Sequence, residues 1–330
     1  MKKNTKLCGE KAYLDEASLF EMGNMTEIIE ITKPLKIGHE RTCKCLPQHI
    51  NCLTAKEWIQ SQVAIWEFFY EKRDIRDKNI HPAVFPIGLP KKCIQLFTHQ
   101  GELVLDPFAG IGTTLVAASD LNRNAVGFDL KKEYVDFANK RVSQTKLDLW
   151  DLQPQLLTVQ IAISDEAHHI PEYLEPETVA LAVTSPPYAN ILNRPRLNKS
   201  IRGNLRQNEH FLKIQQYSTD PRDLGTMEPK KYAQTLGEIY KGILPLLKPK
   251  AHSVINVTDI WWKDDNCGKR IPVHLYIIEE MEKAGYELRN IIIWDRRNLV
   301  NKVGIFGWPS NYITLGTTFE YILDFWRPPN

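Results

Sequence analysis

The chain has 330 residues, of which 43% are hydrophobic, enough to form the core of one large α/β domain or two small ones. Its 42 Lys and Arg nearly balance its 40 Asp and Glu, so the net charge of +2 gives no general sign of a nucleic-acid-binding protein. No apolar run approaches the roughly 20 residues that a membrane helix needs, and we expect no membrane association. The opening MKKNTKLCGE does not resemble a signal peptide, and the six cysteines are scattered, so we expect a reduced, cytoplasmic protein.

The first 53 residues have no clear hydrophobic periodicity and predict an irregular arm. Four residues of this arm are of types that could bind zinc, namely Cys43, Cys45, His49 and Cys52. Their spacing matches none of the common paired-ligand patterns. We therefore expect free thiols in a loop and no bound metal.

A helical pattern begins at Thr54, which can cap a helix together with Glu57. The stretch TAKEWIQSQVAIWEFFY predicts one docked helix with an apolar face of Trp58, Val63, Trp66, Phe69 and Tyr70. A proline-punctuated loop, HPAVFPIGLP, follows and leads into a second helix that carries Ile94 and Leu96.

Strands and helices then alternate along the chain. The expected strands cover residues 102–107, 124–130, 156–165, 177–184, 252–260, 287–295 and 317–326. The expected helices between them cover residues 115–122, 131–144, 229–250 and 271–286. This order predicts an α/β fold with an open, doubly wound, mostly parallel sheet, whose ligands gather at the carboxyl ends of the strands. The last two strands are close enough in sequence to pair as an antiparallel hairpin.

The motif DPFAGIGTT, from Asp106 to Thr114, predicts a ligand-binding turn after the first of these strands. Gly110 and Gly112 bring bare backbone close to a ligand. The third glycine of a dinucleotide-binding motif is replaced by Leu115, and there is no P-loop lysine. Asp129, at the end of the next strand, is placed to accept hydrogen bonds from ribose hydroxyls. The alternative is that the glycines only turn the chain and that Asp129 caps a helix.

A second motif, TSPPY at Thr184 to Tyr188, follows the strand 177–184. Two consecutive prolines stiffen the strand end, so that its carbonyls can serve as acceptors beside the Ser185 hydroxyl. Such acceptors can draw an exocyclic base amine toward a pyramidal nitrogen whose lone pair attacks an electrophilic methyl group. Tyr188 offers a face on which an unstacked base can lie. The alternative is an ordinary Pro-Pro turn.

HPAVFP, DPFAGIGTT, GFDL followed by Tyr134, ISD and TSPPY, in that order, resemble the S-adenosylmethionine-dependent DNA methyltransferases that methylate amino groups. The resemblance covers roughly Trp58 to the C-terminus and implies a Rossmann-like methyltransferase fold with S-adenosylmethionine as cofactor. The cofactor-binding residues it implies are His81, Pro82, Asp106, Phe108, Gly110, Gly112, Thr113, Thr114, Asp129, Ser164 and Asp165, the last reading the cofactor's adenine. It implies catalysis by a tetrad of consecutive residues, Ser185, Pro186, Pro187 and Tyr188.

The serine of the tetrad resembles the cytosine-N4 branch of this family more than the adenine-N6 branch, and some serine-type members methylate adenine. C5 methylation is not expected, because it needs a Pro-Cys dipeptide and none of the six cysteines follows a proline. Two further alternatives are an RNA amine methyltransferase and a catalytically silent nucleic-acid-binding module.

The stretch Ala189 to Arg222 is locally basic and predicts the contact with double-stranded DNA. The residues expected to bind DNA are Arg194, Arg196, Lys199, Arg202 and Arg206, with Arg296 and Arg297 forming an opposite wall. A solvated loop is the alternative. We thus expect an arm over residues 1–53 and a catalytic domain over 54–330 with a DNA-recognition insertion at about 189–228. A further partner implied by the resemblance is a cognate restriction endonuclease acting on the same site.

Overall fold

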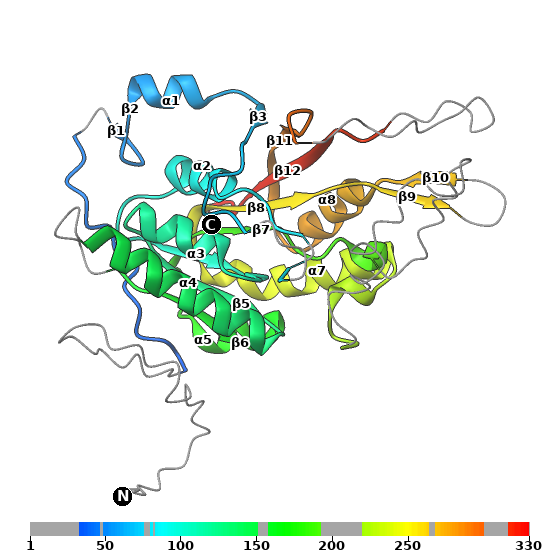
Figure 1. The fold of residues 1–330 in the computed structure, drawn as a ribbon, viewed down its shortest axis with the longest axis horizontal. Coiled ribbons are helices and arrows are strands. Elements are labelled where there is room, and N and C mark those ends of the chain that lie inside the picture. The colour runs from blue at the N-terminus through cyan, green and yellow to red at the C-terminus, as the bar shows by residue number, and fades with distance from the viewer. Residues whose placement is uncertain are drawn as a thin grey trace, which may run out of the picture.

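The computed structural model describes residues 33–46, 49–75, 80–81, 83–150, 158–192, 220–263, 268–299 and 316–329. Its centre is an eight-stranded sheet in the order β3-β11-β12-β8-β7-β4-β5-β6 (Figure 1). Among the helices of these residues, none combines the length and the apolar character needed to cross a bilayer.

Five neighbouring strands of this sheet run parallel, from β8 through β7, β4 and β5 to β6. Their bounds are β4 Leu103–Asp106, β5 Asn124–Asp129, β6 Gln160–Ser164, β7 Val179–Thr184 and β8 Leu247–Val257. On the other side of β8, β12 (Phe319–Trp326) runs antiparallel to both β8 and β11 (Glu287–Asp295). The predicted α/β class, the mostly parallel sheet and the C-terminal antiparallel hairpin are confirmed.

Alternating side chains of the buried strands enter two separate hydrophobic cores, one on each face of the sheet. In β4, Leu103 and Leu105 belong to one core and Val104 to the other. The first core is covered by α5 (Ile170–Tyr173), α7 (Pro229–Ile243) and α8 (Val273–Lys283). The second is covered by α2 (Gly88–Phe97), α3 (Thr113–Asp120) and α4 (Lys132–Trp150). Helices on both faces explain why strands such as β7 are apolar throughout.

The predicted helix after Thr54 is correct at its start and wrong in its length. The Thr54 side chain accepts from the Glu57 backbone and the Glu57 carboxylate accepts from the Thr54 backbone, as expected of a capping box. However, α1 (Ala55–Ser61) is short and buries none of its residues. Residues Ile65–Glu67 form the edge strand β3, which pairs parallel with β11. Trp66 and Phe68 enter the second core while their neighbours stay exposed, which is the alternation of a strand.

Two small hairpins lie outside the central sheet. Within the predicted irregular arm, β1 (His49–Ile50) pairs with β2 (Leu53–Thr54) and leads directly into α1. Figure 1 shows this hairpin and α1 set apart from the helices that cover the sheet. The second hairpin pairs β9 (Ile260–Lys263) with β10 (Gly268–Ile271) and projects from the body beside α8 (Figure 1).

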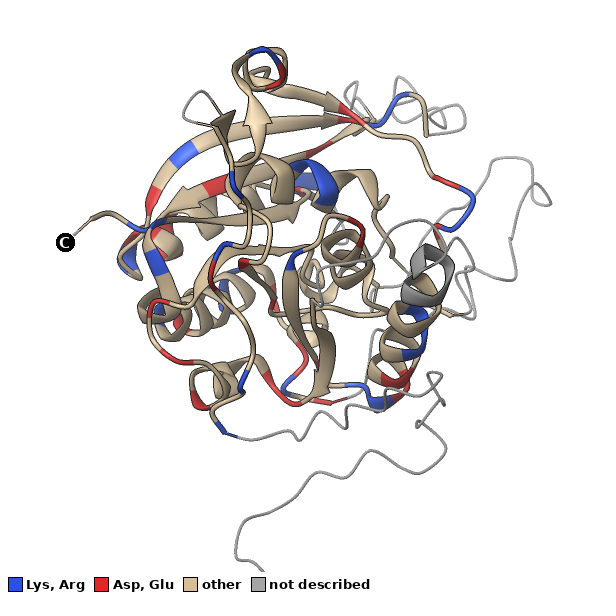
Figure 2. Ribbon diagram, turned by 90° about the vertical axis from the view of Figure 1, so that its left-hand side faces the viewer, with Lys and Arg blue, Asp and Glu red and all other residues tan. Residues whose placement is uncertain are grey.

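Basic and acidic residues are interspersed along the described ribbon in the view of Figure 2. This agrees with the near balance of 42 Lys and Arg against 40 Asp and Glu. In this view the described part presents no broad face of one sign, so a nucleic-acid contact would have to come from local groups.

Candidate active site

The two predicted motifs meet at the carboxyl edge of the parallel strands. Because β4, β5, β6 and β7 are neighbours and parallel, the residues that follow them lie together. They border a cavity of about 980 Å³, counting space open to solvent. Its lining includes Phe108, Gly110, Thr113, Asp129, Asp165, Ser185, Pro187 and Tyr188. Both motifs therefore contribute to one site.

The turn after β4 contains two glycines with left-handed backbone, of which Gly110 lines the cavity and Gly112 does not. Gly110 has φ +49°, and a Cβ there would lie 3.0 Å from His81 Nε2. Gly112 has φ +76°, and a Cβ there would lie 2.8 Å from the Ala138 Cβ. A left-handed conformation disfavours any residue with a Cβ, so conformation favours glycine at both positions, and at Gly112 the contact with Ala138 also leaves no space for a Cβ.

Asp129, at the end of β5, lies in this cavity and is tied to the glycine turn. Its carboxylate accepts from the Gly110 backbone N–H at 3.0 Å and from the Lys131 backbone N–H at 2.9 Å. Burial raises the pKa of Asp129 to about 6. Each carboxylate oxygen has a second lone pair, so the group can still accept from ligand hydroxyls.

Asp165, which follows β6, also lines the cavity. It accepts from His169 Nδ1 at 2.9 Å and from the Tyr173 hydroxyl at 2.7 Å, and from the backbone of Glu166. Burial alone would raise its pKa, but these hydrogen bonds outweigh burial and lower it. Asp165 is therefore a fixed, ionised acceptor on the cavity wall.

Asp106 is held behind the wall rather than on it. It is 1% exposed, and its carboxylate accepts from the Thr184 hydroxyl at 2.6 Å and from the Phe108 backbone at 3.1 Å. It joins the two motifs across neighbouring strands.

Four other predicted cofactor residues do not line the first cavity as described. Gly112, Thr114 and Ser164 are outside its lining, and Pro82 is outside the described residues.

His81 lines the cavity and packs against Tyr134, with the ring centroids 4.8 Å apart. The Ala83 backbone N–H donates to His81 Nδ1 at 3.3 Å. Burial lowers the pKa of His81 to about 4, so the imidazole is neutral at physiological pH.

The tetrad itself is tied into a buried polar network. The Ser185 and Tyr188 hydroxyls lie 3.0 Å apart, and the Tyr188 hydroxyl donates to Glu320 Oε2 at 2.9 Å. Asn256 Nδ2 donates to the Tyr188 hydroxyl and to Glu320, each at 2.7 Å. Arg296 pairs with the other oxygen of Glu320. This network fixes the hydroxyl end of the Tyr188 side chain.

A second cavity of about 1120 Å³, counting open solvent, adjoins the first. The residues that line both cavities are His81, Ala83, Val84, Phe85, Ser185 and Tyr188. Beyond this shared wall the second cavity has aromatic and polar sides, formed by Tyr70, Trp294, Asn256, Arg296 and Glu320 among others. Ser185 and Tyr188 of the tetrad thus lie in the wall between two neighbouring cavities.

Asn256, Glu320 and Asp223 are site residues that the sequence did not indicate. Asn256 lies on β8 and Glu320 on β12, and antiparallel pairing of these strands brings both to Tyr188. Asp223 lines the first cavity and accepts from the Gly225 backbone at 2.7 Å. Asn, Glu and Asp occur throughout the sequence, and these three residues lie outside the two motifs, so no local sequence pattern identifies them.

Most of the residues expected to bind DNA lie outside the described part of the chain, namely Arg194, Arg196, Lys199, Arg202 and Arg206. The ends of that stretch are described and meet at the site. The Asn190 backbone N–H donates to the Met227 carbonyl at 2.9 Å. Leu192 lines the second cavity and Arg222 the first. Arg296 lines the second cavity, and Arg297, with an exposed side chain, pairs with Asp295.

Comparison with known sequences gives matches to DNA methylases. Residues 32–140 match the sequence profile of the N6_N4_Mtase family, described as DNA methylase. The type II methyltransferase M.BglI of Bacillus subtilis is 38% identical over 93 residues, 28% of this chain and 26% of that protein. The orphan methyltransferase M.BamHII of Bacillus amyloliquefaciens is 44% identical over 62 residues, 19% of this chain and 23% of that protein. These matches confirm the resemblance to amino-group DNA methyltransferases over that part of the chain.

The aligned part spans about a quarter of the length of the curated relatives it matches. Among solved structures, a SAM-dependent methyltransferase from Methanosarcina mazei is similar with a TM-score of 0.43 and 9% identity, covering 72% of this chain and 98% of that one. A SAM-dependent methyltransferase from Aquifex aeolicus has a TM-score of 0.39 and 14% identity, covering 72% and 89%.

Proposed function

We propose that this chain, whose residues 32–140 match the DNA methylases, transfers a methyl group from S-adenosylmethionine to the N4 amine of a cytosine flipped out of duplex DNA. The observation that carries the proposal is the wall shared by the two cavities, in which Ser185 and Tyr188 take part. A methyl donor on one side and a base on the other would meet at the tetrad.

The first cavity suits S-adenosylmethionine. Gly110 lines its wall with a left-handed backbone that favours glycine, and without a side chain its backbone can approach a ligand. Asp129 would accept from the ribose hydroxyls and Asp165 from the exocyclic amine of the adenine. When bound, the cofactor supplies an electrophilic methyl group.

The second cavity suits an extruded base. Its aromatic residues offer faces for stacking, which offsets the few kcal/mol that unstacking costs. Ser185 Oγ and the strand-end carbonyls of the tetrad would accept from the target amine and make its nitrogen lone pair available. Asn256 Oδ1, buried and without a hydrogen-bond partner among the described residues, adds an acceptor at this end of the site.

The preference for cytosine rests on the serine of the tetrad, by analogy with the family. Recognition of DNA rests on the basic stretch that leaves and re-enters the body at the cavity rims, near Leu192 and Arg222. Arg296 and Arg297, at the other side, complete the proposed contact. The proposed substrate is therefore duplex DNA entering over the second cavity.

The proposal is tested with tritiated S-adenosylmethionine and either duplex DNA or total RNA, followed by mass spectrometry of the nucleosides. Label in N4-methylcytosine of DNA is expected. Label in N6-methyladenine would overturn the base assignment, and label confined to RNA would overturn the DNA assignment. No label with either substrate, in protein that binds the cofactor, would favour a silent binding module.

The tetrad is tested with Ser185→Ala. Loss of the acceptor should abolish methyl transfer and leave cofactor affinity measurable by calorimetry. Ser143→Ala is a matched control, because this serine lies on α4 and its hydroxyl donates to the Asn139 carbonyl at 3.0 Å. Unchanged turnover in Ser185→Ala would show that the tetrad is not the catalytic group.

A further inference from the structure

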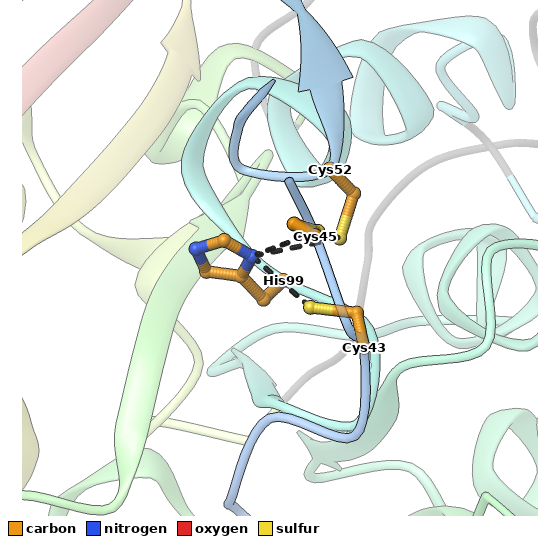
Figure 3. A group of neighbouring side chains, drawn as sticks. All are labelled: Cys43, Cys45, Cys52 and His99. Carbon is orange, nitrogen blue, oxygen red and sulfur yellow. Dashed lines mark hydrogen bonds between the residues drawn. The ribbon is translucent and has the colours of Figure 1, made fainter. Parts of the chain in front are cut away.

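Three cysteines and one histidine converge at the amino-terminal edge of the sheet. Cys43 and Cys45 lie in the extended segment before β1, Cys52 lies in the turn between β1 and β2, and His99 follows α2. One ligand atom from each lies within 4.8 Å of all the others. In Figure 3 the three sulfur atoms gather around Nδ1 of His99.

The separations are close to those of a tetrahedral zinc site. His99 Nδ1 lies 3.3 Å from Cys43 Sγ, 3.8 Å from Cys45 Sγ and 3.5 Å from Cys52 Sγ. The sulfurs of Cys45 and Cys52 lie 3.3 Å apart. A tetrahedral Zn²⁺, with bonds of about 2.3 Å to sulfur and about 2.0 Å to nitrogen, places its ligand atoms roughly 3.5 to 3.8 Å apart. Small movements would therefore complete the coordination.

Ordinary packing of thiols does not produce this arrangement. Cys93 shows the ordinary case, since it is 0% exposed and lies within the second hydrophobic core. The four residues of the cluster are only half-buried, and all four bring a metal-binding atom to one point. A disulfide between Cys45 and Cys52 would account for two of the four residues and would not explain why Cys43 and His99 lie beside them.

The surroundings suit an anionic metal centre. Three thiolates and one Zn²⁺ carry a net charge of −1, and the buried guanidinium of Arg123 interacts favourably with Cys52, Cys43 and Cys45. Arg123 is fixed by the Thr98 hydroxyl and carbonyl, at 3.1 and 2.8 Å. The Gln100 backbone N–H also points to Cys52 Sγ, at 3.5 Å. Groups around the ligands that stabilise their charge are typical of metal sites.

We propose that Cys43, Cys45, Cys52 and His99 bind one structural zinc ion. Cys₃His is a ligand set of structural sites, in which four protein ligands leave no position open for a substrate. The position of the cluster agrees with a structural role, because His99 lies before the start of β4 whereas the proposed active site lies at the end of β4. This proposal departs from the expectation of free thiols, and the fourth ligand is His99 in place of His49.

The ion would fasten the segment that carries β1, β2 and α1 to the body. Cys43, Cys45 and Cys52 belong to that segment and His99 to the body. No residue of α1 is fully buried, and among the described residues the segment packs on the second core only through the partly buried Leu53 and Trp58, so the ion would add a second attachment. Metal binding of this kind contributes directly to the folding free energy.

The test is the metal content of the full chain, purified without chelator and measured by plasma mass spectrometry. We expect about one zinc per chain in the wild type, as four protein ligands imply. His99→Gln and Cys45→Ser should lose it. His49→Gln is the matched control and should retain it. Retention in His99→Gln together with loss in His49→Gln would overturn the assignment of the fourth ligand.

A ligand variant that fails to fold would also lose zinc, so a second measurement uses the wild type alone. Cobalt exchanged into the site should give the intense visible bands of tetrahedral Co²⁺ and a thiolate charge-transfer band in the near ultraviolet. A mercurial reagent should release the metal as it titrates the thiols. Absence of both zinc and cobalt binding, stoichiometric iron in place of zinc, or a Cys45–Cys52 disulfide in freshly purified protein would each overturn the proposal.

Discussion

At the scale of single residues, the tetrad depends on side chains that do not belong to the motif. The Tyr188 hydroxyl is held by Asn256 and Glu320, which fixes the position of the far end of the ring. Positioning of this kind affects a reaction strongly, because small errors in the placement of a reacting group lower the rate. Asn256 is accordingly a positioning residue in the proposed mechanism.

We expect Asn256→Ala to lower kcat for methyl transfer by about tenfold or more, which corresponds to ~1.4 kcal/mol. Cofactor affinity should stay unchanged, because Asn256 lines the second cavity and is absent from the lining of the first. Steady-state kinetics and calorimetry measure the two effects. Asn139→Ala is the control, since it loses two hydrogen bonds of an asparagine side chain away from the tetrad, both to Ala162 on β6. Equal loss of kcat in both variants would point to general destabilisation.

Asp129 gives the proposed cofactor site a dependence on pH. Its pKa of about 6 in the free protein means that the carboxylate is ionised at pH 7.5 and protonated at pH 5. Ribose hydroxyls donate better to the ionised form, so affinity for S-adenosylmethionine should fall as the pH drops through 6, approaching roughly tenfold per unit below it. Calorimetry from pH 5 to 8 measures this. Asp129→Asn should bind more weakly at pH 7.5 and lose the dependence; an identical dependence in the variant would exclude Asp129 as its cause.

At the scale of elements, the ends of β4 and β7 are joined by Asp106 and Thr184. The two motifs of the site follow these two strands, so this hydrogen bond sets their relative position. Burial raises the pKa of Asp106 to about 6, above its ordinary value near 3.9. Because the folded state holds this proton more tightly, the contribution to stability is full below pH 4 and is lost as the pH rises through 6.

Asp106→Asn should therefore stabilise the fold at pH 7.5, by about 1 to 3 kcal/mol. The amide oxygen can still accept from Thr184 and from the Phe108 backbone, so the geometry is retained. At pH 5 the gain should shrink, since most Asp106 is already protonated there. Urea unfolding at the two pH values measures the difference. A gain of the same size at both values would contradict the assigned titration.

The sequence predicted the elements that carry the site much better than it predicted their neighbours. The strands that end at Asp106, Asp129 and Thr184 are largely apolar and lie between turn residues, which is enough to locate them. The stretch from Ile65 to Phe69 was misjudged, because its aromatic residues fit a helical face as well as the alternation of a strand. Pairing with β11 decides between these, and pairing is not visible in a local pattern.

The same limit applies to contacts between distant residues. Glu320 lies 132 positions after Tyr188, and His99 lies 56 positions after Cys43. Bringing these together requires the order of strands in the sheet and the path of the arm across it. Single-sequence patterns give neither, so the sequence indicated the two aspartates that line the first cavity, Asp129 and Asp165, but neither the polar network nor the proximity of His99 to the cysteines.

At the scale of the whole molecule, the near-zero net charge leaves DNA binding to local basic groups. We expect the double variant Arg202→Ala, Arg206→Ala to bind duplex DNA more weakly. The plot of log K against log salt should become shallower by about 1.8, since each phosphate contact contributes ~0.9 to the slope. Fluorescence anisotropy at several salt concentrations measures this.

The control is the double variant Lys241→Ala, Lys283→Ala, which also removes two positive charges. Both lysines lie in the last turns of their helices, α7 and α8, which precede β8 and β11 and so end at the amino-terminal edge of the sheet. Their removal should leave the slope unchanged. Equal slopes in the wild type and the arginine variant would contradict the basic stretch as the contact surface.

The hydrogen bond from Asn190 to Met227 has an evolutionary consequence. The chain leaves the sheet near Asn190 and returns beside the same point, so the intervening stretch is a detour whose two ends are already joined. Doubling the length of such a detour adds only about 0.6 kcal/mol of loop-closure cost. Lengthening or replacing this stretch therefore costs the fold little, and under the proposed function its exchange would change the target sequence without altering the chemistry at the strand ends.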